Sequence, residues 1–382
     1  MLRGPAMSDC SPPKDAAAAA GLTHVTSDAP GFARRRAGKG FAYVGLDGRR
    51  LADPKALARI RSLAIPPAWT DVWICPSPEG HVQAVGKDDK ARKQYLYHPA
   101  FRAVRDGAKY AHMLAFAEAL PALRERVARD MARPGLGRDK VLATVAHLLE
   151  ATMIRVGNLA YAKANGSFGL TTLRNRHVRI EGSALRFEFK GKSGKLWRLG
   201  LKDRRIARIV RSCQELPGQQ LFQYLDESGA RQSVTSADVN AYLREVTGAE
   251  ITAKDFRTWT GSVLAATALA GLEPAGSPTQ ARRNLNRVIR QVADELGNTA
   301  AICRKCYVHP AIVDAYLDGA LALDATDAPS DLAPEEAAVL AFLRGRLARD
   351  IPARSGEVRR NRPRAKENGR GQAQSGDLPG QA

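Results

Sequence analysis

The stretch that decides the fold reads HVRIEGSALRFEFKGKSGKLWRLGL and covers residues 177–201. It contains three runs rich in strand-forming residues, separated by turn sequences at 182–183 and 191–194. The predicted strands lie at 177–181, 185–190 and 195–201. Together they form a three-stranded β-meander, and Lys192 lies at the tip of its second turn.

Helices are expected on both sides of this meander. Before it, residues 109–133 and 138–155 carry apolar side chains at helical spacing. After it, capping-box sequences at 252–255 and 277–280 mark the starts of two helices, and Gly297 ends the second. The rest of this domain is predicted to be helical as well.

A smaller domain with a different pattern is predicted before these helices. Asp47-Gly48 is typical of a hairpin turn, and Asp53-Pro54 is typical of a helix start. The expected strands lie at 41–44, 49–51, 71–75 and 81–85. The fold class is therefore α+β, with a small, mixed, β-rich N-terminal domain and a larger, mainly α-helical domain that contains the meander.

Composition divides the chain into five regions. They are a flexible leader at 1–32, an N-terminal domain at 33–105, a helical domain at 106–322, a linker with an accessory helix at 323–350, and a disordered basic tail at 351–382. The leader and the tail lack apolar periodicity and are rich in small and polar residues. Met1 and Met7 are both candidate start residues.

The chain is strongly basic. Its 382 residues include 59 Lys and Arg against 39 Asp and Glu, a formal net charge of +20. Such an excess predicts a polyanionic partner, and nucleic acid is the first candidate. An acidic membrane surface is the alternative, but the charge is spread along the chain and not gathered on one amphipathic helix. No apolar run approaches the roughly 18 residues of a membrane span, and residues 16–20 are too short for the core of a signal peptide. We therefore expect a cytoplasmic protein.

Tyr307 lies in the sequence CRKCYVHP, residues 303–310. A phenol beside cations and a helix-breaking proline is poorly explained as a core side chain. It is better explained as a nucleophile. The Cys303-x-x-Cys306 pair lacks a second pair for zinc, so no metal site is expected there. His309 is interpreted as a turn residue and not as a catalyst.

Four other polar residues stand upstream in distinctive local sequences. They are Arg155 in IRVGN, Lys192 in FKGKS, Arg257 in KDFRT and Asn298 in LGNT. Together with Tyr307, this ordered set resembles the active site of the type IB DNA topoisomerases, in the small poxvirus-like form found in bacteria. The resemblance covers about residues 36–322. It rests on the joint order of the residues, since a single Arg or Lys is most often a solvated surface residue.

The resemblance implies a role for each of the five residues. Tyr307 would attack a phosphodiester and form a 3′-phosphotyrosyl link, while Arg155 and Arg257 would neutralise the five-coordinate phosphorus. Lys192 would protonate the leaving 5′-oxygen. Asn298 stands where poxviral relatives carry His, and it can donate a hydrogen bond but cannot become a cation. The covalent link conserves energy, so neither ATP nor a metal cofactor is implied.

The resemblance also implies DNA contacts. Gln94, Tyr95 and Tyr97 match groove-facing residues of the family, and Tyr161 matches another DNA-contacting position. Alternation leaves open a different placement, in which both N-terminal tyrosines lie on one buried strand face. Asn158 stands where poxviral enzymes have a base-contacting lysine, so their target preference is not expected here. The implied partner is double-stranded DNA, held by a monomeric clamp in a cytoplasmic, nucleoid-associated enzyme.

Two other functions remain open at this point. A tyrosine recombinase would have a related catalytic fold, but its His-x-x-Arg pair is absent, since Lys254 stands three residues before Arg257. Its Leu-Gly-His sequence is absent too, because Asn298 follows Gly297. A non-enzymatic DNA-architectural protein would need only the positive charge. An assay for relaxation of supercoiled plasmid in EDTA without ATP distinguishes a topoisomerase from a recombinase and from an architectural protein.

Overall fold

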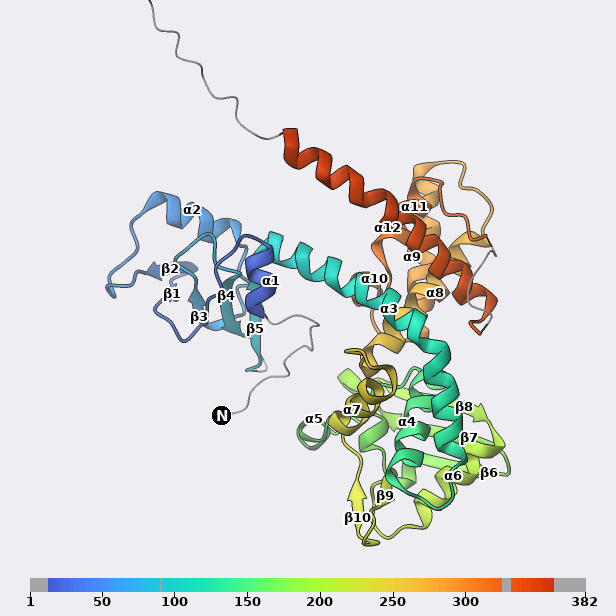
Figure 1. Cartoon of the computed structure of the whole chain (residues 1–382). Helices are drawn as coiled ribbons and strands as arrows, with labels where there is room; N and C mark the ends of the chain where they lie inside the picture. The colour runs from blue at the N-terminus through green and yellow to red at the C-terminus, as the bar shows by residue number, and fades with distance from the viewer. Residues whose placement is uncertain (1–12, 90, 325–330, 361–382) are drawn as a thin grey trace, which may run out of the picture.

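The computed structural model describes residues 13–89, 91–324 and 331–360. Figure 1 shows a β-rich N-terminal domain and a mainly helical domain, joined by the long helix α3 (Pro99–Ala132). The helical domain contains the small sheet that the sequence predicts. The α+β fold class is therefore confirmed.

The N-terminal domain is built on a five-stranded antiparallel sheet in the order β2-β1-β3-β4-β5. Its strands are β1 (Phe32–Ala37), β2 (Gly40–Val44), β3 (Thr70–Ile74), β4 (Val82–Lys87) and β5 (Lys93–Tyr97). Helix α2 (Pro54–Ser62) begins as predicted, because Asp53 accepts hydrogen bonds from the backbone N–H groups of Lys55 and Ala56. Ile60 of this helix joins the buried apolar cluster formed by the strands.

The first hairpin differs from the prediction. β1 pairs with β2, whereas residues 49–51 contribute only a bridge between Arg50 and Val44. Apolar periodicity misses β1 because three consecutive arginines lie within it. One of them, Arg34, donates hydrogen bonds to backbone carbonyls of the loop at 65–69, so its polar head is satisfied inside the domain.

Helix α1 (Pro13–Ala19) lies in the region predicted as a flexible leader. Its Ala16 and Ala17 are buried in a cluster with Phe101 of α3. The sequence predicts a flexible leader over residues 1–32, whereas the structure has a helix from residue 13. This helix is packed because small alanine side chains let α1 approach α3 closely. Residues 1–12 lie outside the described part of the chain.

The long helix α3 starts earlier than the predicted residue 109. Helix α4 (Arg138–Thr152) begins where predicted but ends before the predicted residue 155, because the chain leaves it through Met153 in the left-handed conformation. The other helices of this domain are α5 (Leu159–Asn165), α6 (Arg204–Glu215), α7 (Ser236–Thr247), α8 (Ala253–Ala270), α9 (Pro278–Glu295), α10 (Ala300–Cys306) and α11 (Pro310–Leu317). Thr252 and Ser277 cap α8 and α9 as predicted. Helices α3, α4, α7 and α8 pack against one another and form the main core. Within the described residues, no helix is long and apolar enough to cross a bilayer.

The predicted meander is present. Its strands are β6 (Val178–Glu181), β7 (Ala184–Lys190) and β8 (Leu196–Lys202), in the order β6-β7-β8. Leu185, Phe187 and Phe189 of β7 are buried, and β7 packs against α6. The turn between β7 and β8 holds Lys192 at its tip, as expected.

A second small hairpin occupies a region expected to be helical. It consists of β9 (Gln223–Leu225) and β10 (Arg231–Ser233). Asp226 fixes the turn between them, since its Oδ1 accepts hydrogen bonds from the backbone N–H groups of Ser228 and Ala230 at 3.0 and 2.9 Å.

The accessory helix α12 (Pro334–Arg360) is longer than the sequence suggests. It continues into residues 351–360, which the sequence places in the disordered tail because this stretch contains Pro352 and Gly356, two poor helix formers. Glu336 attaches the helix to the core, since it accepts hydrogen bonds from Arg124 at 2.9 Å and from Nε1 of Trp259 at 3.2 Å. Residues 325–330 and 361–382 lie outside the described part of the chain.

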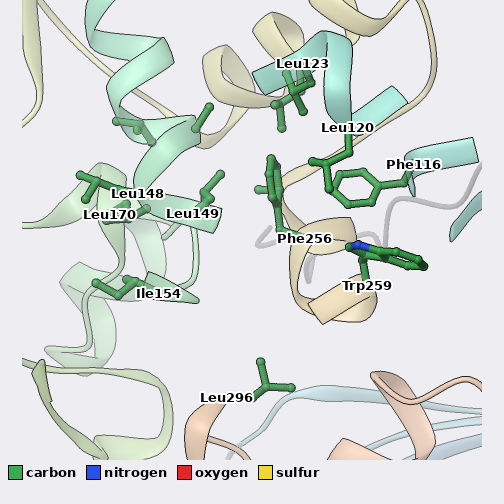
Figure 2. Close-up of a cluster of buried hydrophobic side chains, with 14 of the residues drawn as sticks. Phe116, Leu120, Leu123, Leu148, Leu149, Ile154, Leu170, Phe256, Trp259 and Leu296 are labelled. Carbon is green, nitrogen blue, oxygen red and sulfur yellow. The ribbon is translucent and has the colours of Figure 1, made fainter. Parts of the chain in front are cut away.

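The buried core adjoins three of the five candidate site residues. Figure 2 shows Ile154, Phe256 and Leu296 among the core side chains, and none of the three is more than 3% exposed. Each lies within two residues of a candidate site residue in the sequence. The core therefore fixes the backbone from which these candidate side chains extend.

Candidate active site

Arg155 lies just after α4, where the chain leaves the helix through Met153 in the left-handed conformation (φ 53°). Ile154 anchors this turn in the core. Gly169 lets a second segment approach, because a Cβ there would lie 2.5 Å from the carbonyl oxygen of Arg155. That oxygen instead accepts the N–H of Leu170 at 2.9 Å. The backbone of Arg155 is therefore held from both sides.

Arg257 ties three segments of the site together. Its side chain, on α8, is 3% exposed. Nη1 donates to the carbonyl of Met153 and Nη2 donates to the carbonyl of Leu296 at 2.5 Å. The guanidinium carbon lies 5.1 Å from the centre of the Tyr307 ring. Within the described residues its buried Nε has no hydrogen-bond partner, which leaves one donor for an anionic group.

Tyr307 follows the last residue of α10, with its ring against the guanidinium of Arg257. Gly261 of α8 makes room for it, since a Cβ there would lie 2.9 Å from the carbonyl oxygen of Tyr307. The Ser262 hydroxyl donates to the same carbonyl at 3.1 Å and accepts the N–H of His309 at 3.0 Å. These contacts fix the backbone from the carbonyl of Tyr307 to His309.

The electrostatics of the site favour a phenolate. Burial raises the pKa of Tyr307, but the charges of Arg257 and Arg155 and a hydrogen bond from Arg257 outweigh it, so this pKa lies below its usual value. Burial, and after it the charge of Arg155, lowers the pKa of Arg257 to about 10. Among the described residues, neither arginine forms an ion pair with a carboxylate. Two cations without an acidic partner attract an anion.

Asn298 is held by Arg155. Its Oδ1 accepts from Nη2 of Arg155 at 2.5 Å, and its backbone N–H donates to the carbonyl of Ala293 at 2.7 Å. In the flipped orientation, the NH₂ group of Asn298 would face the N–H of Arg155, and two donors cannot form a hydrogen bond; Oδ1 therefore points to Arg155. Nδ2 is buried and has no partner within the described chain. The amide therefore presents another donor next to Arg155.

Lys192 is the candidate residue that does not join this cluster. It is exposed on a short 3₁₀ turn, η3 (Lys192–Gly194), in which Ser193 has a φ of 61°. The N–H of Gly191 closes the turn by donating to the carbonyl of Lys195 at 2.8 Å. Within the part of the chain that the structure describes, the Lys192 ammonium makes no hydrogen bond or ion pair, so the structure brings together four of the five predicted residues.

Two family models match the chain. The family model described as "Eukaryotic DNA topoisomerase I, catalytic core" matches residues 98–326, more than half of the chain. The chain belongs to the type IB DNA topoisomerases. A second family model, "Bacterial DNA topoisomerase IB, N-terminal domain", matches residues 40–88. These matches favour neither a recombinase nor an architectural protein.

Viral type IB topoisomerases are among its relatives. The chain is 31% identical over 293 residues to the DNA topoisomerase 1B of Acanthamoeba polyphaga mimivirus, covering 75% of this chain and 87% of the relative. It is 21% identical over 237 residues to the DNA topoisomerase 1B of vaccinia virus (strain Copenhagen), covering 61% of this chain and 72% of the relative. The DNA topoisomerase I of monkeypox virus is similar to the same extent.

In this type IB topoisomerase, the N-terminal residues predicted to contact DNA lie on β5. Tyr95 is 44% exposed, and its ring stacks on that of Tyr97 with centres 5.9 Å apart. Tyr97 in turn lies 5.4 Å from the ring of Phe101. The two tyrosines lie on the same face of β5, as strand alternation predicts. Tyr95 is exposed on that face, so the alternative in which both tyrosines are buried is wrong for Tyr95. Gln94 donates from Nε2 to Asp88 at 3.0 Å.

Tyr161 lies on α5 of the helical domain. Asn158 caps this helix by accepting the N–H of Tyr161 at 2.9 Å. The pKa of Arg92, beside β5, is raised first by its hydrogen bond to Asp88 and, among smaller contributions, by the Tyr161 phenol. The residues expected to contact DNA therefore come from both domains, β5 of the N-terminal domain and α5 of the helical domain.

The cysteine pair and His309 have structural explanations. Burial raises the pKa of Cys303 to about 11, so its thiol is protonated at neutral pH. Among the described residues, no group of three His, Cys, Asp or Glu side chains could hold a metal ion. His309 caps α11, since its Nδ1 accepts the N–H of Ala311 at 3.0 Å. The structure thus places it at the start of a helix, as expected for a residue of a turn.

Sequence reasoning misses three residues that build this site. They are Gly261, Ser262 and Trp197. The contacts of Ser262 with Tyr307 span 45 residues of sequence, and no local pattern marks such a pair. Trp197 lies against Gly297, where a Cβ would come 2.5 Å from Cζ2 of the indole. A tryptophan two residues into a strand gives no sign of this contact.

Proposed function

We propose that this type IB topoisomerase relaxes supercoiled duplex DNA through a transient 3′-phosphotyrosyl link at Tyr307, followed by religation. The observation that carries the proposal is the buried Tyr307 phenol, whose pKa Arg257 and Arg155 hold below its usual value. A phenol with an ordinary pKa of about 10 is a weak nucleophile at neutral pH. The two cations favour the phenolate and also attract the phosphate that it attacks.

The reaction needs one bond to form and one to break. Oη of Tyr307 releases its proton to solvent and forms a bond to phosphorus, while the bond from phosphorus to the 5′-oxygen breaks and that oxygen takes up one proton, so the protons balance. Arg155 and Arg257 stabilise the charge that builds up on the non-bridging oxygens. The unpaired donors of Arg257 and Asn298 are suited to the same oxygens. The link conserves the energy of the broken bond, so the 5′-hydroxyl reseals the strand by the reverse reaction without ATP.

The departing 5′-oxygen requires a proton, and we assign this task to Lys192. The donor must approach the phosphate from the side of the leaving group, opposite the attacking phenol. Lys192 is exposed at a hairpin tip and makes no ion pair within the described residues, so its long side chain is able to reach a bound strand. An ammonium carries three donors and no acceptor, which suits it to general acid catalysis.

Duplex DNA would lie between the two domains. We assign its contacts to Gln94, Tyr95 and Tyr97 on β5 and to Tyr161 on α5, and the exposure of Tyr95 supports the assignment on the side of the N-terminal domain. The proposed domains are a DNA-clamping domain at 33–105 and a catalytic domain at 106–322. The enzyme would act as a monomeric clamp on the nucleoid in the cytoplasm.

Relaxation of a supercoiled plasmid tests this function directly. The purified protein should relax the plasmid in EDTA without ATP, and denaturation during the reaction should leave protein attached to the 3′ ends of nicked strands. Strand exchange between specific sites would instead indicate a recombinase. Binding without any change of topology would leave only an architectural role.

Asn298 should contribute to cleavage as a hydrogen-bond donor. We expect Asn298→Ala to slow single-turnover cleavage by about 10²-fold, the usual effect of losing one transition-state donor. Asn298→Asp is the matched control, because it has nearly the same shape and keeps an oxygen for Arg155 but replaces the NH₂ donor with a negative charge. It should be at least as slow as the alanine variant. Near-normal cleavage by Asn298→Asp would show that the amide donates nothing to the phosphate.

A further inference from the structure

One indole ring contacts two loops of the site at once. Trp197 of β8 covers Gly191, where a Cβ would lie 2.6 Å from Cδ1 and from Nε1 of the ring. It also covers Gly297, where a Cβ would lie 2.5 Å from Cζ2. Real Cβ atoms do not approach so closely, so both glycines leave room for the same side chain. Gly191 directly precedes Lys192, and Gly297 directly precedes Asn298.

The indole is itself held in place by the sheet. Trp197 pairs across the strands with Phe189, and their rings stack with centres 6.2 Å apart and planes 3° apart. Phe189 is buried in the core of the domain. The hydrogen bond from Gly191 to Lys195 closes the turn around the ring. A rigid aromatic group therefore connects the meander to the loop that follows α9.

The tip of the β7–β8 hairpin depends on the contact with Trp197 more than the Gly297–Asn298 loop does. The Gly297–Asn298 loop has other supports, since Leu296 is fully buried and Asn298 donates from its backbone to Ala293. Apart from Trp197, the described hairpin reaches the end of α9 through a 4.0 Å ion pair between Lys195 and Asp294, and both side chains are exposed. Such surface pairs contribute at most about 1 kcal/mol.

We infer that Trp197 is a positioning residue, which holds the Lys192 hairpin against the Gly297–Asn298 loop and so fixes the proton donor relative to the phosphate site. The inference rests on the proposed role of Lys192. The side chain of Lys192 makes no hydrogen bond within the described residues, so its position follows from the backbone of the hairpin, where the Lys192 carbonyl accepts the N–H of Lys195. A residue that acts in this way affects proton donation and leaves the attack by Tyr307 largely intact.

The test compares two substrates in single-turnover cleavage at saturating enzyme. One has the ordinary 5′-bridging oxygen, and the other has sulfur at that position, which leaves as a thiolate without needing a proton. We expect Trp197→Ala to cleave the oxygen substrate about 10²-fold more slowly, the usual effect of a misplacement of about 1 Å. It should cleave the sulfur substrate at nearly the rate of the unmodified enzyme. The double variant with Lys192→Ala should be no slower than Lys192→Ala alone, since both changes remove the same step.

A second variant keeps the test valid if removal of the indole prevents folding. Gly191→Ala suits the local backbone, which has a φ of −92°, but its methyl group would collide with Trp197. It should show the same selective loss on the oxygen substrate. Leu196→Ala is the control, because this neighbouring side chain is 50% exposed and should leave both rates unchanged.

The possible failures are distinguishable. If Trp197→Ala and Gly191→Ala slow both substrates equally, or slow neither, the positioning role is overturned while the tyrosine chemistry stands. If sulfur fails to rescue Lys192→Ala itself, the proposed proton donor is wrong and the inference about Trp197 falls with it.

Discussion

Tyr307→Phe should abolish plasmid relaxation and the covalent adduct while leaving the affinity for DNA unchanged. The substitution removes a single oxygen, which is the atom proposed to bond to phosphorus. The aromatic ring remains, so its contact with the guanidinium of Arg257 at 5.1 Å is retained. Ser262 contacts the backbone carbonyl of Tyr307, so the loss of the Tyr307 phenol hydroxyl does not disturb that contact either. We therefore expect a folded protein that binds DNA and does no chemistry.

The measurement separates binding from chemistry on the same DNA. Gel-shift titration at a fixed salt concentration should give the affinity of the unmodified enzyme, whereas denaturing gels should show no protein attached to DNA. Tyr316→Phe is a matched control, because it removes another phenol hydroxyl, which accepts a hydrogen bond from Asn284 on α9. This control should remain active. A trapped adduct in the Tyr307→Phe variant would show that another residue is the nucleophile.

Local sequence patterns predict the elements that obey simple periodicity. The meander at 177–201 and the start of helix α4 at residue 138 follow from turn residues and apolar spacing, and the structure confirms them. β1 is missed because its arginines are satisfied by hydrogen bonds to a distant loop at 65–69. α1 is missed because a short alanine-rich helix is stable only through its packing on α3. In both cases tertiary contacts decide the local structure.

In the candidate site, too, local sequence predicts some features and tertiary contacts decide the others. The five residues are identified from their local sequences, yet nothing local predicts that Arg257 would hold the ends of α4 and α9 through the carbonyls of Met153 and Leu296. The pairing of Arg155 with Asn298 is equally invisible in the sequence, since the two are 143 residues apart. Such contacts follow from the arrangement of the helices, and they explain why the site is organised before any DNA is bound.

Lys192→Ala should slow strand cleavage by roughly the 10²–10⁴-fold that general acid catalysis contributes, with little change in DNA binding. The lysine side chain makes no hydrogen bond or ion pair within the described residues, so its removal should cost the fold little. The loss should appear in single-turnover cleavage at saturating enzyme, where differences in affinity do not contribute. Thermal unfolding should show the stability of the unmodified protein.

The origin of that loss can be established with the substrate that carries sulfur at the 5′-bridging position. A thiolate leaves without a proton, so Lys192→Ala should recover nearly the full rate on this substrate. Arg155→Ala is the matched comparison, because it removes positive charge from the same site but acts on the non-bridging oxygens, whose charge develops with either leaving group. It should therefore be rescued much less. Equal rescue of the two variants, or no rescue of Lys192→Ala, would show that Lys192 is not the principal proton donor and would leave it as a lysine that contacts the phosphate backbone.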